Sequence, residues 1–135
     1  MNASNEFKLK AEIDGRVAEL VELGNDIIER VASKLGDIEV NQIRNLVAVA
    51  NSAPHPAIVI NFIRYQMGRS ATRAWKATGL GDEVIKAIEG PVRRMAKEAD
   101  DSAATNSVDH VQAQMTRLLL GFLNRSFVYR REAKK

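Results

Sequence analysis

Three residues at four-residue spacing, Tyr65, Arg69 and Arg73, are the strongest candidate for a binding site in this sequence. Residues four apart lie along one ridge of an α-helix, so a helix through this segment would present one aromatic ring and two guanidinium groups together. An arginine fork binds a pair of phosphate oxygens, and its plane can also stack. The chemistry predicted here is the binding of a phosphate-bearing polyanion.

The charges around this ridge are all of one sign. Between Asn41 and Gly81 there is no Asp or Glu, and the five Lys/Arg are Arg44, Arg64, Arg69, Arg73 and Lys76. Residues 1–40 hold five cations and nine acids (net −4), residues 82–111 four and seven (net −3), and residues 112–135 six and one (net +5). Because surface helices normally mix both signs, the acid-free stretch predicts an anion-binding face, and nucleic acid is the commonest large cellular anion.

Further side chains join the predicted nucleic-acid-binding set. They are Gln42, Arg44, Arg64, Lys76, Arg117 and Arg125. Arg117 and Arg125 lie in the middle of the last predicted helix, where the helix dipole does not explain a cation, whereas it does explain Arg130 and Arg131 at the helix end. For each of these residues the alternative is an ordinary solvated helix surface.

The sequence contains no pattern typical of an enzyme active site or a metal site. The chain has no cysteine, and therefore no disulfide, thiolate metal site or cysteine nucleophile. His55 lies between two prolines and His110 in the first turn of the last predicted helix, and neither has carboxylates at metal-ligand spacing. There is no Ser, His and Asp set typical of a triad and no glycine-rich phosphate loop. We therefore expect a protein that is not an enzyme and that uses neither a metal nor a cofactor.

The elements that must position these residues are predicted to be helices. Apolar residues recur at three- and four-residue spacing, which predicts an all-α fold. The expected helices cover residues 12–35, 40–51, 56–76, from 82 onward with a kink or split at Gly90-Pro91, and from 107 to about 132. We expect residues 1–10 to be irregular. The whole chain, 1–135, is predicted to be a single domain, a small bundle of about five helices.

The location of the protein is also predicted from what the sequence lacks. Its apolar runs are far shorter than a membrane span, and the N-terminal residues have no basic-then-apolar signal pattern. Together with the absence of cysteine, these features predict a cytoplasmic protein without a membrane partner.

Several of these residues together resemble a known family. The Gln-Ile-Arg-Asn helix start at residues 42–45, Tyr65 followed by Gly68-Arg69, and a last helix rich in Phe and Tyr that ends in basic residues resemble the small subunit of type III-A CRISPR effector complexes, the Csm complex. The resemblance extends over about residues 40–130. Gln42, Arg44, Tyr65 and Arg69 match the family pattern, but residues 124–131 are more basic than that pattern, which leaves open the related small subunit of type III-B complexes.

The resemblance implies a non-catalytic helical bundle that stacks along the complex and contacts the backbones of guide RNA and target RNA without reading their sequence. Its implied partners are RNA, the other subunits of the CRISPR effector complex and further copies of itself. Two alternatives from the residues alone stay open. One is a helical protein-interaction module whose basic blocks meet acidic partners, and the other is a small DNA-binding regulator.

Overall fold

The computed structural model of the chain describes residues 2–133, which contain helices and connecting segments but no strand. The predicted all-α class and the helical bundle are confirmed, with eight α-helices in place of about five. In chain order the elements are α1 (Ala3–Asp14), α2 (Val17–Arg30), η1 (Ala32–Asp37), α3 (Val40–Ser52), α4 (Pro56–Gly68), η2 (Ser70–Thr72), α5 (Ala74–Ala77), α6 (Leu80–Ala87), η3 (Ile88–Val92), α7 (Arg93–Ala103) and α8 (Val108–Ala133).

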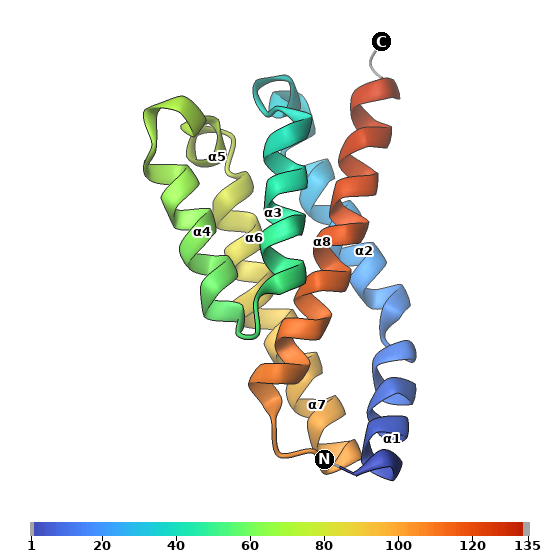
Figure 1. Cartoon of the computed structure of the whole chain (residues 1–135). Helices are drawn as coiled ribbons and strands as arrows, with labels where there is room; N and C mark the ends of the chain where they lie inside the picture. Colours follow the sequence, from blue (N-terminus) through green and yellow to red (C-terminus); the bar gives the residue numbers. More distant parts are fainter. Residues whose placement is uncertain (1, 134–135) are drawn as a thin grey trace.

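The helices form two layers around α8, which at 26 residues is the longest helix described. In Figure 1, α4, α3 and α8 lie side by side at the front, and α2, α6 and α7 run behind them. Helix α1 lies at the lower end against α7. None of the described helices is long and apolar enough to cross a membrane.

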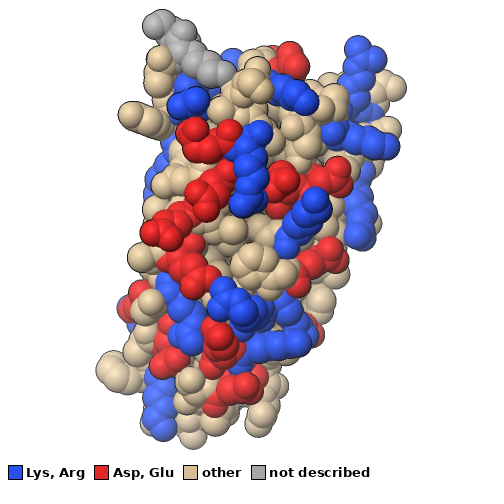
Figure 2. All heavy atoms as spheres, turned by 180° about the vertical axis from the view of Figure 1, so that it is seen from behind, with Lys and Arg blue, Asp and Glu red and all other residues tan. Residues whose placement is uncertain are grey.

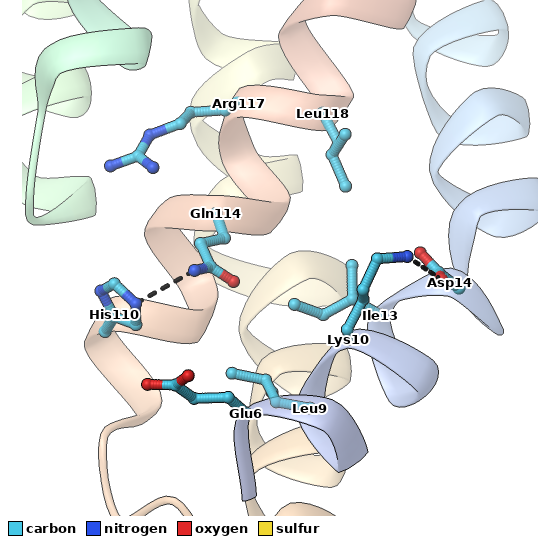
Figure 3. A pocket seen from close by; sticks show the side chains of 9 residues that line it. All are labelled: Glu6, Leu9, Lys10, Ile13, Asp14, His110, Gln114, Arg117 and Leu118. Carbon is cyan, nitrogen blue, oxygen red and sulfur yellow. Dashed lines mark hydrogen bonds and ion pairs between the residues drawn. The ribbon is translucent and has the colours of Figure 1, made fainter. Parts of the chain in front are cut away.

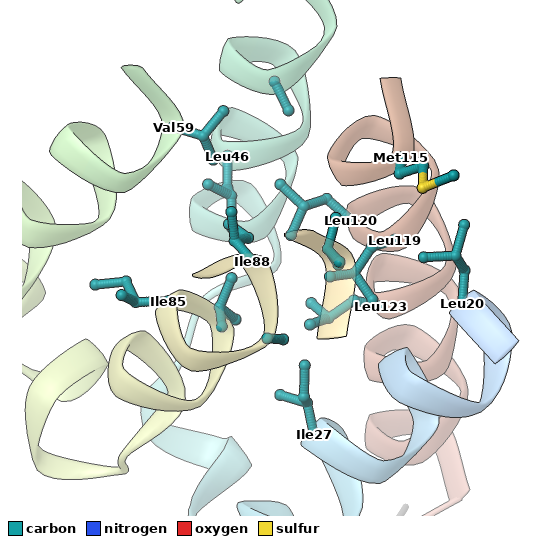
Figure 4. Close-up of a cluster of buried hydrophobic side chains, with 14 of the residues drawn as sticks. Leu20, Ile27, Leu46, Val59, Ile85, Ile88, Met115, Leu119, Leu120 and Leu123 are labelled. Atoms are coloured by element: carbon teal, nitrogen blue, oxygen red, sulfur yellow. The ribbon is translucent and has the colours of Figure 1, made fainter. Parts of the chain in front are cut away.

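The core is one continuous apolar cluster between these layers. Figure 4 shows part of it, with fully buried side chains from α2, α3, η3 and α8 that include Leu20, Ile27, Leu46, Ile88 and Leu123. Gly24 lets α2 approach α8 closely, because a Cβ at this position would lie 3.1 Å from the backbone nitrogen of Leu123. The apolar spacing read from the sequence therefore does mark the faces that turn inward.

The first residues are helical, which corrects the prediction of an irregular segment over residues 1–10. The side chain of Asn2 caps α1 by accepting the N–H of Asn5 at 2.9 Å. Leu9 and Ile13, four residues apart, are buried in the core cluster, and α1 packs against α7. Two buried apolar residues in a mostly polar stretch give only a weak helical pattern, so the sequence did not indicate this helix. Met1 lies outside the described residues.

The predicted helix over residues 12–35 is divided into two helices and a 3₁₀ segment. Helix α1 ends at Asp14, and Gly15 caps it. The Arg16 guanidinium group turns back and donates to both the backbone carbonyl of Glu12 at 2.9 Å and its carboxylate at 3.0 Å. Helix α1 packs on α7, whereas α2 packs on α8. Because the two segments pack against different helices, they form two helices and not one continuous helix.

The predicted break at Gly90-Pro91 is present as the π-helical segment η3 between α6 and α7. Proline has no N–H and cannot support a regular helix at this point. The buried side chain of Gln112 on α8 stabilises the irregular turn by donating to the carbonyl of Ile88 at 2.9 Å. Its own oxygen accepts from Arg93 Nη1 at 2.7 Å, so both ends of the buried amide have partners.

The predicted helix over residues 56–76 ends early, at Gly68. Arg69 is extended, with ψ of 139°, and the chain then turns through η2 into the short helix α5. The buried hydroxyl of Thr72 donates to the carbonyl of Gln66 at 2.8 Å and holds this turn. The turn places Trp75 between α4 and α6 with no exposed surface. Burial of such a large apolar side chain outweighs the few helical hydrogen bonds lost at Gly68.

Candidate nucleic-acid interface

The fold gathers the cations of residues 41–81 at one end of the layer formed by α3, α4 and α5. We call the exposed side chains Arg44, Arg64, Arg69, Arg73 and Lys76, with the Tyr65 ring among them, the cationic surface. Helices α3 and α4 are antiparallel and joined by a short turn, so the start of α3 is level with the end of α4. Helix α5 follows at the same end (Figure 1). Arg44, in the second turn of α3, therefore lies at the same end of the bundle as the last turn of α4.

Within residues 2–133, no cation of the cationic surface forms an ion pair with an Asp or Glu. The arginines of residues 1–40 and 82–111 behave differently, since each has a carboxylate within 4 Å: Arg16 has Glu12, Arg30 has Glu83, Arg93 has Asp109 and Arg94 has Glu19. A guanidinium group without a counter-ion keeps its full charge for an external anion.

The surface charges in Figure 2 agree with this contrast. On the face shown, Lys/Arg and Asp/Glu alternate over the middle of the molecule. Blue side chains project at its upper right, where α4 and α5 lie once the view of Figure 1 is turned.

Tyr65 and Arg69 form the centre of the cationic surface. The guanidinium carbon of Arg69 lies 5.2 Å from the centroid of the Tyr65 ring, and its Nη1 is 3.5 Å from the side-chain oxygen of Gln66. Tyr65 is nevertheless 59% exposed. The pair is a cation–π contact in which the cation lies over the ring.

The predicted helical ridge of Tyr65, Arg69 and Arg73 is wrong as a helical row. Helix α4 ends at Gly68, so Arg69 is extended and Arg73 lies beyond η2 at the start of α5. The three residues do not share a helix face, because the turn that buries Trp75 separates Arg73 from α4. The prediction assumed one helix through residues 56–76, and the burial of Trp75 prevents it.

A shallow hollow lies at the end of α4. It has a volume of about 210 Å³ and is lined by Arg64, Met67, Gly68 and Lys76. A Cβ at Gly68 would meet no atom within 4 Å, so the hollow is open above the backbone of this residue. Cations from α4 and α5 therefore flank an open hollow, to which Gly68 contributes only backbone atoms.

Two residues of the predicted binding set have partners inside the fold. The side-chain oxygen of Gln42 accepts the N–H of Glu39 at 3.2 Å and so caps the start of α3. Arg117 reaches the other end of α3, where it donates to the carbonyls of Ala50 at 2.9 Å and Ala53 at 2.8 Å. The Glu-x-x-Gln spacing at residues 39–42 is a sequence signal for the first contact, whereas no local pattern indicates the second.

Arg125 lies apart from the cationic surface. Its guanidinium carbon is 5.7 Å from the centroid of the Phe122 ring on the same helix. It lines a hollow of about 490 Å³ with Asn25, Ile28 and Glu29 of α2, together with Ser126, Tyr129 and Arg130 of α8. The structure therefore places Arg125 on the α2 side of α8, away from α4 and α5.

Sequence reasoning missed a network at the opposite end of α4. The ring nitrogen Nδ1 of His55 accepts the N–H of Ala57 at 3.0 Å and caps α4, and Nε2 lies 3.3 Å from Asp109. Arg93 donates to Asp109 at 2.6 Å. This hydrogen bond, together with the charges of His55 and Arg93, holds the pKa of Asp109 below its ordinary value. These residues come from the α3–α4 turn, α7 and α8, and no local spacing connects them.

A larger hollow, of about 520 Å³, lies between α1 and α8 (Figure 3). Five of the six polar side chains that line it are engaged with one another or with the fold, because Lys10 donates to Asp14 at 2.8 Å, His110 contacts Gln114 at 3.0 Å and Arg117 caps α3. Across residues 2–133, no group of three or more His, Asp or Glu side chains is arranged to hold a metal ion. The groups around this hollow do not converge on a common point (Figure 3).

Comparison with known proteins finds no matching family model, curated protein or solved structure. The geometry offers an open surface of unpaired cations around an exposed ring, with a shallow hollow in place of a deep cleft. Such a surface suits an extended anion better than a small enclosed molecule.

Proposed function

We propose that this chain is a non-catalytic subunit of a type III CRISPR ribonucleoprotein that binds the backbones of guide and target RNA through the cationic surface. One observation carries the proposal: the five cations of residues 41–81 are exposed, as is Tyr65, and within residues 2–133 none of these cations forms an ion pair with a carboxylate. The resemblance to the Csm small subunit adds support, because Arg44, Tyr65 and Arg69 of its pattern all belong to this surface.

The physical mechanism is the neutralisation of phosphates with release of their counter-ions. Log affinity for a single strand then falls with log salt concentration, with a slope of roughly −0.7 per phosphate contacted. Contacts to phosphates fix position but carry no base information, so binding is indifferent to RNA sequence.

The remaining partners would be protein subunits of the same complex, including further copies of this chain. Residues 1–40 and 82–111 carry net charges of −4 and −3, which suits contacts with basic neighbours. In this arrangement the acidic blocks face protein and the cationic surface faces RNA.

The test is the binding of RNA and DNA by the double variant Arg69→Ala, Arg73→Ala at several salt concentrations. We expect affinity to fall similarly for unrelated RNA sequences, and the salt slope to become flatter by roughly 1.4 if each arginine contacts one phosphate. The matched control is Lys86→Ala, Lys97→Ala, which removes the same charge from two exposed cations of α6 and α7 that have no ion-pair partner within residues 2–133.

Each other outcome excludes part of the proposal. Unchanged binding by the arginine double variant would remove the cationic surface as the RNA site. Equal losses in both double variants would mean that net charge alone attracts RNA. An absence of any RNA or DNA shift in the unmodified protein would favour a protein-interaction module, and preference for one duplex DNA sequence would favour a DNA-binding regulator.

A further inference from the structure

Tyr65 has an unusual environment for an aromatic side chain in this fold. Trp75 and Phe127 are fully buried, whereas Tyr65, Tyr129 and Phe7 are largely exposed. Phe7 lies in the acidic block of residues 1–40, and Tyr129 lines the α2–α8 hollow that contains Glu29. Of these three exposed rings, only Tyr65 lies in a stretch of the chain that has cations and no acids.

The surroundings of the Tyr65 ring leave room for a flat ligand. Arg69 covers one side of the ring, with its guanidinium carbon 5.2 Å from the centroid. With 59% of the residue exposed, much of Tyr65 stays open to solvent despite this contact. A flat group stacked there would complete a sandwich of base, ring and guanidinium, in which the cation–π contact is already formed and costs no further ordering.

The hollow at the end of α4 lies within reach of a ligand stacked on Tyr65. Gly68 is three residues after Tyr65 and so lies on the same side of α4, and Arg64 and Lys76 flank the hollow above it. These cations would hold an anionic group attached to the flat ligand. An aromatic base joined to a phosphate has this combination of parts.

We propose that Tyr65 stacks on one unpaired nucleobase while Arg64 and Lys76 hold a neighbouring phosphate in the hollow above Gly68. The inference rests on the proposed function and names its ligand as single-stranded RNA with at least one base free of pairing. Bases inside a duplex are stacked on both faces, so a duplex offers only phosphates to this surface.

The first experiment separates stacking from charge. Fluorescence of 2-aminopurine placed within a single-stranded RNA is quenched when the base stacks on an aromatic ring. We expect quenching by the unmodified protein and by Tyr65→Phe, and loss of quenching by Tyr65→Leu together with an affinity about tenfold lower. The salt slope of Tyr65→Leu should stay unchanged because no phosphate contact is removed. Phe7→Leu, which changes another exposed ring, on α1, is the matched control and should bind as the unmodified protein does.

The second experiment fills the hollow. Gly68→Val adds a side chain where a Cβ meets nothing within 4 Å, so the fold is preserved while the phosphate position is occupied. We expect weaker RNA binding and a flatter salt slope. Gly36→Val adds the same side chain at an exposed glycine of η1 with equally open surroundings and should leave binding unchanged.

The outcomes separate this inference from the proposed function. If Tyr65→Leu binds and quenches as the unmodified protein does while Arg69→Ala, Arg73→Ala still weakens binding, stacking is excluded and the phosphate-binding role stands. If neither variant changes binding, both proposals fail. Equal affinity for single-stranded and duplex RNA in the unmodified protein would also exclude the stacked base.

Discussion

Arg69, just beyond the end of α4, and Arg93, in the first turn of α7, are both arginines of one small bundle, yet their surroundings differ. Arg93 donates to Asp109 at 2.6 Å and to the buried oxygen of Gln112 at 2.7 Å, and so joins α7 to α8. Among residues 2–133, the Arg69 side chain contacts the Tyr65 ring and has a long contact of 3.5 Å to Gln66. The guanidinium group of Arg93 joins two helices, whereas that of Arg69 has no ion-pair partner within residues 2–133.

The same difference extends to the two regions that contain these residues. In the α1–α2–α7 region, Arg94 bridges Glu19 at 2.5 Å and Glu98 at 3.2 Å, and the bond to Glu19 raises the pKa of Arg94 above its ordinary value. In the α3–α4–α5 region no such partner exists within residues 2–133, because residues 41–81 contain no acid and the fold brings none to these cations. For the arginines of these two regions, the presence or absence of nearby carboxylates therefore decides which of them form ion pairs.

The largest expected difference between Arg93 and Arg69 is in their contribution to the free energy of unfolding. Arg93→Ala should lower the free energy of unfolding by roughly 1–3 kcal/mol, because it leaves the buried oxygen of Gln112 without a donor. Arg69→Ala should change it by less than about 0.5 kcal/mol. Urea unfolding followed by circular dichroism measures both. Similar losses for the two variants would show that Arg69 also stabilises the fold.

A second, smaller effect is expected at Arg117, which the sequence places among the RNA contacts and the structure uses to cap α3. Arg117→Ala should cost roughly 1–2 kcal/mol of unfolding free energy, because two carbonyls at the helix end lose a charged donor. Its RNA affinity, measured where the variant is fully folded, should match that of the unmodified protein. A marked loss of RNA affinity would return Arg117 to the binding surface.

The smallest effect is a pH dependence confined to the network around Asp109. Because the folded protein holds the pKa of Asp109 below 3.8, the unfolded chain binds more protons in this range, and stability rises with pH there. The contribution is fully present above the ordinary pKa and is lost as pH falls through the lowered one. Asp109→Asn should therefore flatten the acid limb of stability between pH 5 and about pH 2, measured by urea midpoints. An unchanged acid limb would mean that other carboxylates control it.

The sequence predicted the parts of the fold that depend on neighbouring residues. The apolar spacing determined the all-α class and the inward faces, Pro54 and Pro56 separated α3 from α4, and Gly90-Pro91 marked the irregular turn η3. The absence of acids from Asn41 to Gly81 is likewise visible in the chain itself. Each of these features depends on contacts within a few positions, where sequence patterns are informative.

Only the tertiary structure decided which cations are free and where the long helices divide. Arg94 finds Glu19 at a separation of 75 residues, Arg117 finds Ala50 at 67, and no local pattern connects either pair. The end of α4 at Gly68 depends on the burial of Trp75 between α4 and α6, which a helical pattern over residues 56–76 does not reveal. Ion pairing and side-chain burial are set by the surfaces that meet in three dimensions, so the site took its final form only when the helices packed.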